Sequence, residues 1–425
     1  MNIKCNRHSL HRPGITTSLF KILLSTVTLL LSITTISCND ESAVLPGIIG
    51  SSLNITTDPE GVAVYMNNVD KKALTPVSLP DVEPGFYKLT LSKRTYLDTT
   101  YYVLLKRGLE DKLFFEMREN PVYWWRTYTM SYIGLPFGYI NRVRVDKLNR
   151  KWFASDFGVI LLADSTFTVY NSGNSGIQSS SILDLYSASD GKVWFATTGG
   201  IIRYDGSTFT QFNTANSDLP ENYITCVYEG KNSVFWFGTR SSGLLRYDGV
   251  NFIRYNTDNS GIASDRVTAL ATDTSGVVYV GTAGAGISIF NGTSWRQLNS
   301  FSNSLRSDFI SKLLFHPDGS LWIGMGYSLS AGGIAKWDGS QISNYIVRGS
   351  EGTANLITDL ALDLKNNLWI STGDQGLFYF RSGKMIQYTK RNSGIIADEA
   401  LSIAIDQTGD KWIAGNGISQ YWGRK

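Results

Sequence analysis

A repeated segment from residue 121 onward constrains the fold of this chain more than any other feature of its sequence. An aromatic residue followed by two small or apolar residues recurs seven times at spacings of 42 to 47 residues, and an apolar residue precedes each aromatic by twelve positions. The recurring aromatic residues are Trp152, Trp194, Trp236, Tyr279, Trp322, Trp369 and Trp412. A constant offset indicates a β-hairpin of fixed length with the aromatic residue in its second strand. Because neighbouring copies need large apolar groups where they pack, we expect these aromatic side chains in the core.

Each repeat continues beyond this hairpin with two further short strands. A glycine-containing loop leads into a third strand, and an Asp-Gly or Asn-Gly pair follows that strand in four of the copies. These pairs are Asp205-Gly206, Asp248-Gly249, Asn291-Gly292 and Asp338-Gly339. Such pairs tolerate φ > 0 at both positions, as a type I′ turn requires, so we interpret them as turns and not as metal ligands. Four antiparallel strands per repeat indicate propeller blades, and seven copies predict a seven-bladed β-propeller.

The last copy stops after its third strand, at residues 417–422. A matching fourth strand stands at the other end of the repeats, where Trp125-Arg126-Thr127-Tyr128-Thr129 resembles Phe252-Ile253-Arg254-Tyr255-Asn256 of the third copy. We therefore expect the N-terminal segment to complete the last blade, so that the ring closes without an unpaired strand edge.

The composition argues against several classes of function. Only 18% of the 425 residues are charged, and the formal net charge of +3 becomes about −1 without residues 1–37, so no nucleic-acid partner is expected. Beyond residue 38 the sequence has one cysteine, Cys226, and one histidine, His316, so we expect no disulfide framework and no His-rich metal site, and a Ser-His-Asp arrangement would have His316 as its one candidate. Cys226 lies in an apolar run that indicates core packing, and His316 occupies a hairpin turn. We predict no catalytic residue, no metal site and no cofactor.

The first 37 residues have the pattern of a secretory signal. Four basic and no acidic residues precede a 15-residue apolar stretch at 22–36, which is too short to span a bilayer. Thr35-Ile36-Ser37-Cys38 resembles a bacterial lipobox, which implies cleavage before Cys38 and a lipid anchor in a bacterial membrane. The acidic pair at 40–41 resembles a surface-export signal and implies the outer membrane, facing the cell surface or alternatively the periplasm. An ordinary secretory signal with an incidental cysteine is the alternative.

Residues 50–118 alternate apolar and polar side chains in short runs separated by turns, as β-strands do. The marked turns are Asp58-Pro59-Glu60-Gly61-Val62, Leu74-Thr75-Pro76, Glu83-Pro84-Gly85 and Thr95-Tyr96. They resemble those of the PEGA domain, which implies a small β-sandwich that serves as an accessory or spacer module. We therefore divide this all-β chain into a signal peptide (1–37), a linker (38–49), a PEGA-like domain (50–118) and the propeller (121–425).

Short loops of the repeats carry a second resemblance. Three of them are Asn174-Ser175-Gly176-Ile177, Asn259-Ser260-Gly261-Ile262 and Asn392-Ser393-Gly394-Ile395. With the aromatic strands, these loops resemble the two-component-regulator propeller repeat (Reg_prop). The resemblance implies an extracytoplasmic ligand-sensing domain of the kind found in hybrid histidine kinases, frequently for glycans. Because neither a transmembrane helix nor a kinase sequence follows the repeats here, we expect no phosphosignalling activity from this polypeptide.

The residue immediately before each inner strand should lie at the mouth of the central channel, beside the loops between second and third strands. This position holds Tyr139, Ser181, Tyr223, Arg266, Phe309, Leu356 and Glu399. The side chains vary while the neighbouring strand positions stay uniform, and the aromatic and charged ones suit stacking on, and hydrogen bonding to, a sugar or peptide. The predicted ligand-binding residues are Tyr139, Tyr223, Arg266, Phe309 and Glu399, with Arg240 and Asp374 from the loops. A solvated rim without a ligand is the alternative.

These features favour a membrane-anchored lipoprotein whose propeller face binds a glycan or a protein. Two hypotheses from other classes stay open: a carbohydrate-active lyase or glycosidase that uses carboxylates on the propeller face, and a structural partner in an envelope complex. No feature of the sequence points to one particular ligand or oligomeric state.

Overall fold

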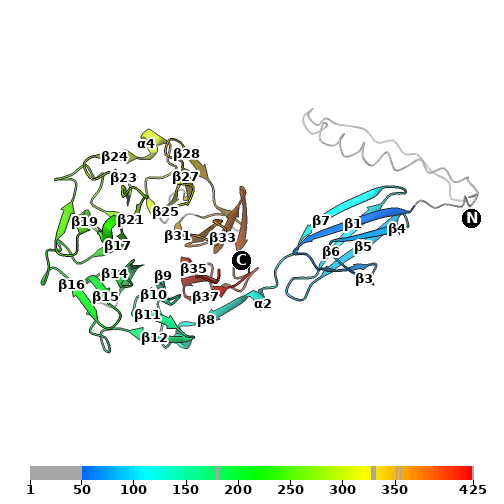
Figure 1. Cartoon of the computed structure of the whole chain (residues 1–425), viewed down its shortest axis with the longest axis horizontal. Helices are drawn as coiled ribbons and strands as arrows, with labels where there is room; N and C mark the ends of the chain where they lie inside the picture. The colour runs from blue at the N-terminus through cyan, green and yellow to red at the C-terminus, as the bar shows by residue number, and fades with distance from the viewer. Residues whose placement is uncertain (1–49, 179–180, 327–331, 351, 355, 424–425) are drawn as a thin grey trace, which may run out of the picture.

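The computed structural model describes residues 50–423 apart from residues 179–180, 327–331, 351 and 355. The predicted signal peptide and Cys38 lie outside the described residues. Figure 1 shows an elongated β-unit joined by a short connection to a ring of sheets. In the described part, short helical turns stand in the connections: α2 (Pro121–Trp124), α3 (Met130–Ile133), η2 (Lys231–Ser233) and α4 (Ser300–Asn303). The chain is therefore all-β, as its sequence predicts.

The N-terminal unit consists of two sheets around one apolar core. One sheet has the order β4-β1-β7, and the other has the order β3-β2-β5-β6. The strands are β1 (Ser51–Asp58), β2 (Ala63–Met66), β3 (Val69–Leu74), β4 (Val77–Val82), β5 (Gly85–Ser92), β6 (Thr99–Leu105) and β7 (Glu110–Glu116). Alternate residues of β1 and β5 point inward, and Leu53, Ile55, Leu89 and Leu91 are fully buried in the shared core.

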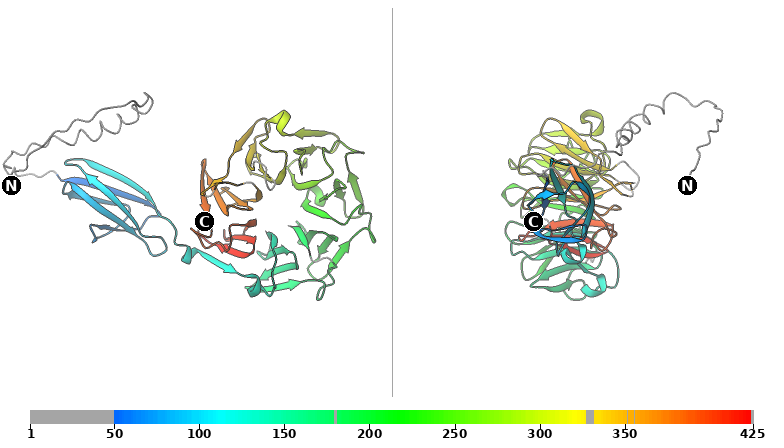
Figure 2. Two further views of the ribbon diagram at one scale, coloured as in Figure 1. Left: turned by 180° about the vertical axis from the view of Figure 1, so that it is seen from behind. Right: turned by 90° about the vertical axis from the view of Figure 1, so that its right-hand side faces the viewer.

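Seven four-stranded antiparallel sheets follow one another around the ring in the described part of the chain (Figures 1 and 2). The inner strands are β9 (Ile140–Val145), β13 (Ile182–Ser187), β17 (Ile224–Glu229), β21 (Val267–Thr272), β25 (Ile310–Phe315), β31 (Ile357–Leu362) and β35 (Ala400–Ile405). Each inner strand contacts the next one, and β35 contacts β9, so these strands form a closed wall around a central channel.

The remaining strands of each sheet lie progressively farther from the channel. The second strands are β10 (Lys151–Ser155), β14 (Val193–Thr197), β18 (Phe235–Thr239), β22 (Val278–Thr282), β26 (Leu321–Met325), β32 (Leu368–Thr372) and β36 (Lys411–Gly415). The third strands are β11 (Gly158–Ala163), β15 (Gly200–Tyr204), β19 (Leu244–Tyr247), β23 (Ile287–Phe290), β27 (Gly333–Trp337), β33 (Leu377–Arg381) and β37 (Gly417–Tyr421). The outer strands are β12 (Thr166–Tyr170), β16 (Phe209–Phe212), β20 (Phe252–Tyr255), β24 (Trp295–Leu298), β28 (Ile342–Tyr345), β34 (Lys384–Tyr388) and β8 (Trp125–Tyr128). A small ribbon, β29 (Arg348–Gly349) and β30 (Gly352–Thr353), precedes β31.

The last sheet is closed by a strand from the N-terminal side of the ring. β8 pairs antiparallel with β37, with Trp125 opposite Tyr421 and Tyr128 opposite Ile418. The rings of Trp125 and Tyr421 stack with centroids 4.6 Å apart. The expected closure is therefore confirmed, and it leaves the last sheet with four strands like its neighbours.

The recurring second-strand tryptophans lie in the core, as expected, and the preceding turn satisfies several of their N–H groups. Trp152 is fully buried and donates from its indole Nε1 to Asp146 Oδ2 at 2.9 Å. Trp412 makes the same bond to Asp406 at 3.0 Å. Asp363 and Trp369 repeat the arrangement at 3.4 Å. A turn carboxylate six residues before the tryptophan thus provides the acceptor that a buried indole requires.

A β-bulge after the first residue of every inner strand links each blade to its neighbour. The pairing register of all seven inner strands shifts between their first and third residues. In four blades the second residue then donates a side-chain hydrogen bond to the carbonyl of the next inner strand's first residue. These bonds are Asn141 Nδ2 to Ile182 O (2.9 Å), Thr225 Oγ1 to Val267 O (2.7 Å), Thr268 Oγ1 to Ile310 O (2.5 Å) and Thr358 Oγ1 to Ala400 O. We call these four bonds the blade latches.

Candidate functional site: the rim and the central channel

The residues predicted to bind a ligand occupy equivalent places at one end of the inner strands, which we call the rim. In six blades the backbone N–H that follows the second strand donates to the carbonyl oxygen of the rim residue, at 3.0 to 3.2 Å. The acceptors are Tyr139, Ser181, Tyr223, Arg266, Phe309 and Leu356. None of the seven rim residues is buried, whereas the next residue, the first of each inner strand, is buried in every blade. The rim is thus the boundary between the packed ring and solvent.

Two predicted residues of one blade contact each other on the rim. The guanidinium carbon of Arg240 lies 4.9 Å from the ring centroid of Tyr223. Arg240 begins the loop after β18, and its backbone N–H is bound to the carbonyl of Tyr223 at 3.1 Å. This bond holds the loop over the ring, so a cation and an aromatic face are presented together.

A second pair forms where the last and first blades meet. The carboxylate of Glu399, through its charge and a hydrogen bond, raises the pKa of Tyr139. Asp156, in the loop after β10, accepts a hydrogen bond from the backbone N–H of Tyr139 at 3.1 Å. Tyr139 therefore stands between two carboxylates and is 40% exposed.

The other predicted residues lie on other blades of the ring. Phe309 bridges to Ala283, and its ring lies against Gly284, where an added Cβ would come within 3.5 Å. Arg266 is exposed, and Asp374 is an exposed residue of the loop between β32 and β33. The structure therefore distributes the predicted residues around the rim in two contacting pairs and does not gather them into one cluster.

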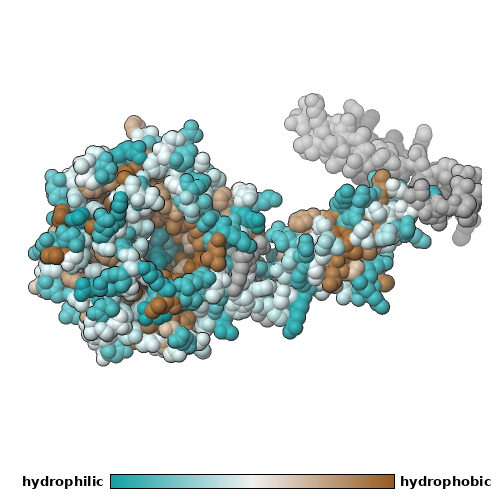
Figure 3. Space-filling view, viewed as in Figure 1, coloured by the Kyte–Doolittle hydropathy of each residue, from teal (hydrophilic) through white to brown (hydrophobic). Residues whose placement is uncertain are grey.

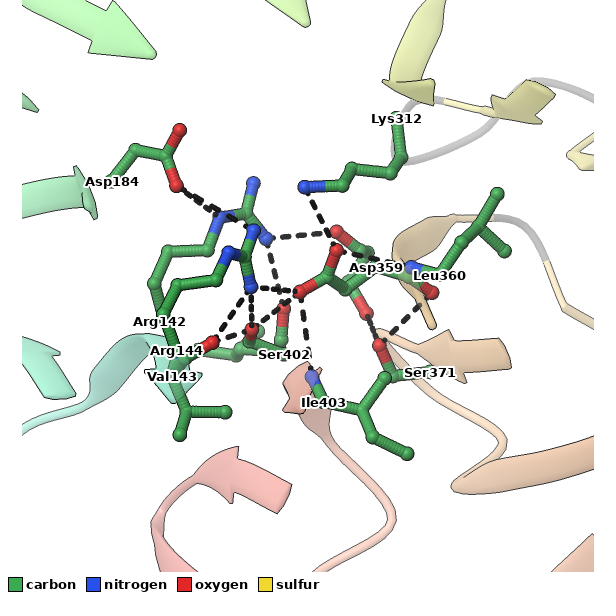
Figure 4. Close-up of polar contacts among 12 residues, drawn as sticks. Arg142, Val143, Arg144, Asp184, Lys312, Asp359, Leu360, Ser371, Ser402 and Ile403 are labelled. Carbon is green, nitrogen blue, oxygen red and sulfur yellow. Dashed lines mark hydrogen bonds and ion pairs between the residues drawn. The ribbon is translucent and has the colours of Figure 1, made fainter. Parts of the chain in front are cut away.

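A buried charged network crosses the channel below the rim, and the sequence interpretation missed it (Figure 4). Its members are Arg142 and Arg144 from β9, Asp184 from β13, Lys312 from β25, Asp359 from β31 and Ser402 from β35. Arg144 Nη1 lies 3.0 Å from Asp359 Oδ2, and Lys312 Nζ lies 3.0 Å from Asp359 Oδ1. Ser402 also donates to Asp359.

Arg142 links its own blade to three of the other blades in the network. Arg142 Nη1 donates to the carbonyl oxygens of Thr358 and Leu401 at 2.9 and 3.1 Å. Arg142 Nε lies 3.4 Å from Asp184 Oδ1, an ion pair without hydrogen-bond geometry. Side chains of five blades thus meet across the channel, which no pairing within a single repeat could achieve.

Burial and neighbouring charges act in opposite directions on the pKa values of Asp359 and Arg144. Burial alone would raise the pKa of Asp359, but the cations Arg144 and Lys312 outweigh it and hold that pKa well below its ordinary value. Burial would lower the pKa of Arg144, and the carboxylates of Asp359 and Asp184 raise it instead. For Lys312 burial prevails, with the nearby arginine charge, and lowers the pKa of the ammonium group. The carboxylate of Asp359 is therefore fully charged at neutral pH.

One signal in the sequence could have identified this network. The third residue of each inner strand is Arg142, Asp184, Cys226, Ala269, Lys312, Asp359 or Ser402. Four of these seven are charged, although the first and fourth residues of the same strands are apolar in every copy. Cys226 is buried, as expected, and desolvation raises the pKa of its thiol to about 12.

Another cavity and the turn that holds His316 lie outside the rim and the central channel. A cavity of about 530 Å³ lies where the N-terminal unit meets the ring, and Tyr96, Trp124 and Trp422 contribute to its wall. His316 lies in the β25–β26 turn, with Nδ1 2.8 Å from Asp318 Oδ1, in agreement with the turn role expected for it. Within the described ranges, no group of three or more His, Cys, Asp or Glu side chains could hold a metal ion.

Comparison with known protein families agrees with this architecture. Residues 50–120 match the PEGA domain, and residues 218–241 match the two component regulator propeller. The chain carries a PEGA domain and a Reg_prop propeller. No curated protein sequence gave a match.

Solved structures of low sequence identity share the propeller fold. The extracellular domain of a putative hybrid two component system from B. thetaiotaomicron has a TM-score of 0.61 and 18% identity, covering 79% of this chain and 50% of its own. A second such domain from that organism has a TM-score of 0.59 and 18% identity, covering 71% of this chain and 40% of its own. Virginiamycin B lyase from Staphylococcus aureus, with quinupristin, has a TM-score of 0.57 and 14% identity, covering 70% of this chain and 98% of its own. The chain thus spans half or less of the two hybrid-system domains.

Proposed function

We propose that this protein is an extracytoplasmic lipoprotein, anchored through Cys38 in a bacterial outer membrane, whose propeller binds a glycan or a protein segment at its rim. The PEGA domain would act as a spacer between the anchor and the propeller. In the described part of the chain, no helix is long and apolar enough to cross a membrane. The hybrid-system neighbours are extracellular domains, which supports the same location for this propeller.

One observation carries the binding proposal. Six of the seven rim positions are held by the same backbone hydrogen bond, yet the seven positions present varied side chains that are not buried. The fold uses only the backbone carbonyl at this position. The side chain is therefore available to contact a ligand. Tyr223 with Arg240, and Tyr139 with Glu399, provide aromatic faces beside charges, and this combination recognises sugar rings and peptide groups.

A binding assay with rim variants tests this function. The protein beginning at residue 39 is titrated with a panel of envelope and plant glycans, and both binding and product release are followed. Tyr223→Ala removes one stacking platform and should weaken binding by roughly 1 kcal/mol, or about fivefold. Tyr102→Ala removes an exposed tyrosine of the PEGA domain (66% exposed) and is the matched control.

The outcomes separate the candidate functions. Binding without turnover that Tyr223→Ala weakens and Tyr102→Ala does not supports the rim. Product release would identify an enzyme, the alternative class. If no glycan binds, capture of an envelope protein by the intact propeller but not by Tyr223→Ala would support a protein ligand, and equal capture by both would count against the rim.

The anchor is tested separately in cells. Cys38→Ser should move the protein from the membrane fraction to the soluble fraction, because the sulfur that carries the lipid is gone while the folded domains are unchanged. Persistence of Cys38→Ser in membranes after a carbonate wash would contradict lipid anchoring.

A further inference from the structure

The central channel contains a cavity that is separate from the rim. It has a volume of about 360 Å³, and its wall is made by residues of the inner strands from the second position onward. None of the seven rim residues contributes to it. Figure 3 shows the ring hollowed at its centre, with both apolar and hydrophilic atoms in the hollow. The cavity therefore belongs to the half of the channel that lies toward the turns between first and second strands.

The wall of this cavity is mainly apolar. Tyr186 and Tyr228 stand side by side on neighbouring blades, with ring centroids 5.1 Å apart. Small side chains, Ala269, Ala361 and Ala404, stand on three other blades and leave the space open. A volume of this size holds on the order of ten non-hydrogen atoms, since one water occupies about 30 Å³.

The charges that face the cavity do not cancel. Arg142, Arg144, Lys312 and Asp184 line it, whereas Asp359 is fully buried behind the wall. Three cations and one carboxylate therefore face the space, and the network as a whole, with Asp359, has one positive charge in excess. A surplus charge among apolar walls is costly unless an opposite charge accompanies it.

Two of these cations have donors left for a ligand. An ammonium group has three N–H donors, and in the described part of the chain Asp359 is the only ion-pair partner of Lys312. Arg144 Nη2 lies 3.8 Å from Asp184 Oδ1, which is beyond hydrogen-bond distance. Both side chains keep about a fifth of their surface exposed, 18% for Lys312 and 21% for Arg144. The lowered pKa of Lys312 has the same origin, an ammonium group buried near arginine charges.

We propose that this cavity is a binding site for a small organic carboxylate with an apolar or aromatic body. The carboxylate binds Lys312 Nζ and the free edge of the Arg144 guanidinium, and it neutralises the surplus charge. The body lies against Tyr186, Tyr228 and the alanine positions. The site is distinct from the rim, since no rim residue lines it.

Calorimetric titration with 3-phenylpropionate tests the site, and 3-phenylpropanamide serves as the neutral probe of the same shape. The carboxylate should bind saturably and the amide at least tenfold more weakly, because charge-assisted hydrogen bonds are about twice as strong as neutral ones. Lys312→Met should weaken carboxylate binding by a similar factor. Ala361→Leu fills the cavity without changing any charge and should abolish binding even where Lys312→Met fails to fold.

Two control variants keep the interpretation specific. Lys336→Met removes a surface lysine that is likewise 3.0 Å from an aspartate, Asp318, and should leave binding unchanged. Tyr223→Ala on the rim should also leave it unchanged. Absence of saturable binding, equal binding of the amide, or undiminished binding by folded Ala361→Leu would each overturn the proposal.

Discussion

Trp125 is the residue on which closure of the ring should depend most. It lies in β8, is only 9% exposed, and stacks on Tyr421 of β37 with a centroid distance of 4.6 Å and an interplanar angle of 22°. Its ring also packs against that of Tyr388, with the two ring centroids 5.9 Å apart. Trp125→Ala removes these contacts while the backbone pairing of β8 with β37 can still form.

The size of the effect follows from the buried surface. A buried aromatic side chain removes about 150–250 Å² from water, and at about 25 cal/mol per Å² this amounts to about 4–6 kcal/mol as an upper limit. Measured truncations of core tryptophan cost about 3–5 kcal/mol. We therefore expect Trp125→Ala to lower the free energy of unfolding by about 4 kcal/mol.

Trp295 provides a matched control in another blade. It stacks on Phe290 with the same centroid distance, 4.6 Å, and the same angle, 22°. In that blade β23 and β24 are joined by a short turn, whereas β8 and β37 meet only when the whole ring closes. Separating β8 from β37 therefore frees far more chain than separating two strands of a hairpin.

Urea unfolding followed by circular dichroism, with native-state hydrogen exchange, measures both parts of this prediction. Both variants should lower the urea midpoint. Trp125→Ala should also speed amide exchange in β8, β37 and the neighbouring blades, whereas Trp295→Ala should affect mainly β24. Exchange profiles equally confined to the altered strand in both variants would refute the reasoning that closure is the weak point of the ring.

Three further predictions concern the interior of the propeller. The pKa of Asp359 is depressed in the folded protein, so the ionised carboxylate contributes its full stabilisation of the fold above the unfolded-state pKa of about 3.9, and this contribution is lost as the pH falls below that value. Asp359→Asn should therefore lower the melting temperature at pH 7 and flatten the decline of the melting temperature toward pH 3. Thr225→Val leaves the carbonyl of Val267 without its latch and should cost about 1–2 kcal/mol in urea unfolding. Trp152→Phe should cost roughly 1 kcal/mol more than Trp194→Phe, because the indole N–H of Trp152 has an acceptor and that of Trp194 has none among the described residues.

Each of these has a contrary result. An unchanged acid decline in Asp359→Asn would show that other carboxylates dominate acid unfolding. Wild-type stability of Thr225→Val would show that the blade latches do not stabilise the ring. Equal costs for the two tryptophan variants would show that the turn carboxylates do not stabilise the buried indoles.

The rim shows how far a repeated sequence can predict a site. Because Tyr223 and Arg240 are fixed by a hydrogen bond within one blade, their approach follows from the repeat spacing. The contact of Tyr139 with Glu399 requires in addition that the first and last blades meet, which the closure by β8 provides. The sequence placed these residues on one face, and the structure determined which of them touch.

The sequence by itself determined the strands, their order within each blade and the strand that closes the ring. These properties follow from spacing, alternation of side chains and turn residues, all of which act over a few tens of residues. The charged network was decided only by the tertiary structure. Arg144 and Asp359, 3.0 Å apart, are separated by 215 residues in the chain. They meet because ring closure brings all the inner strands around one axis. A charged side chain on one blade can therefore pair with a side chain of a blade that is distant in the sequence.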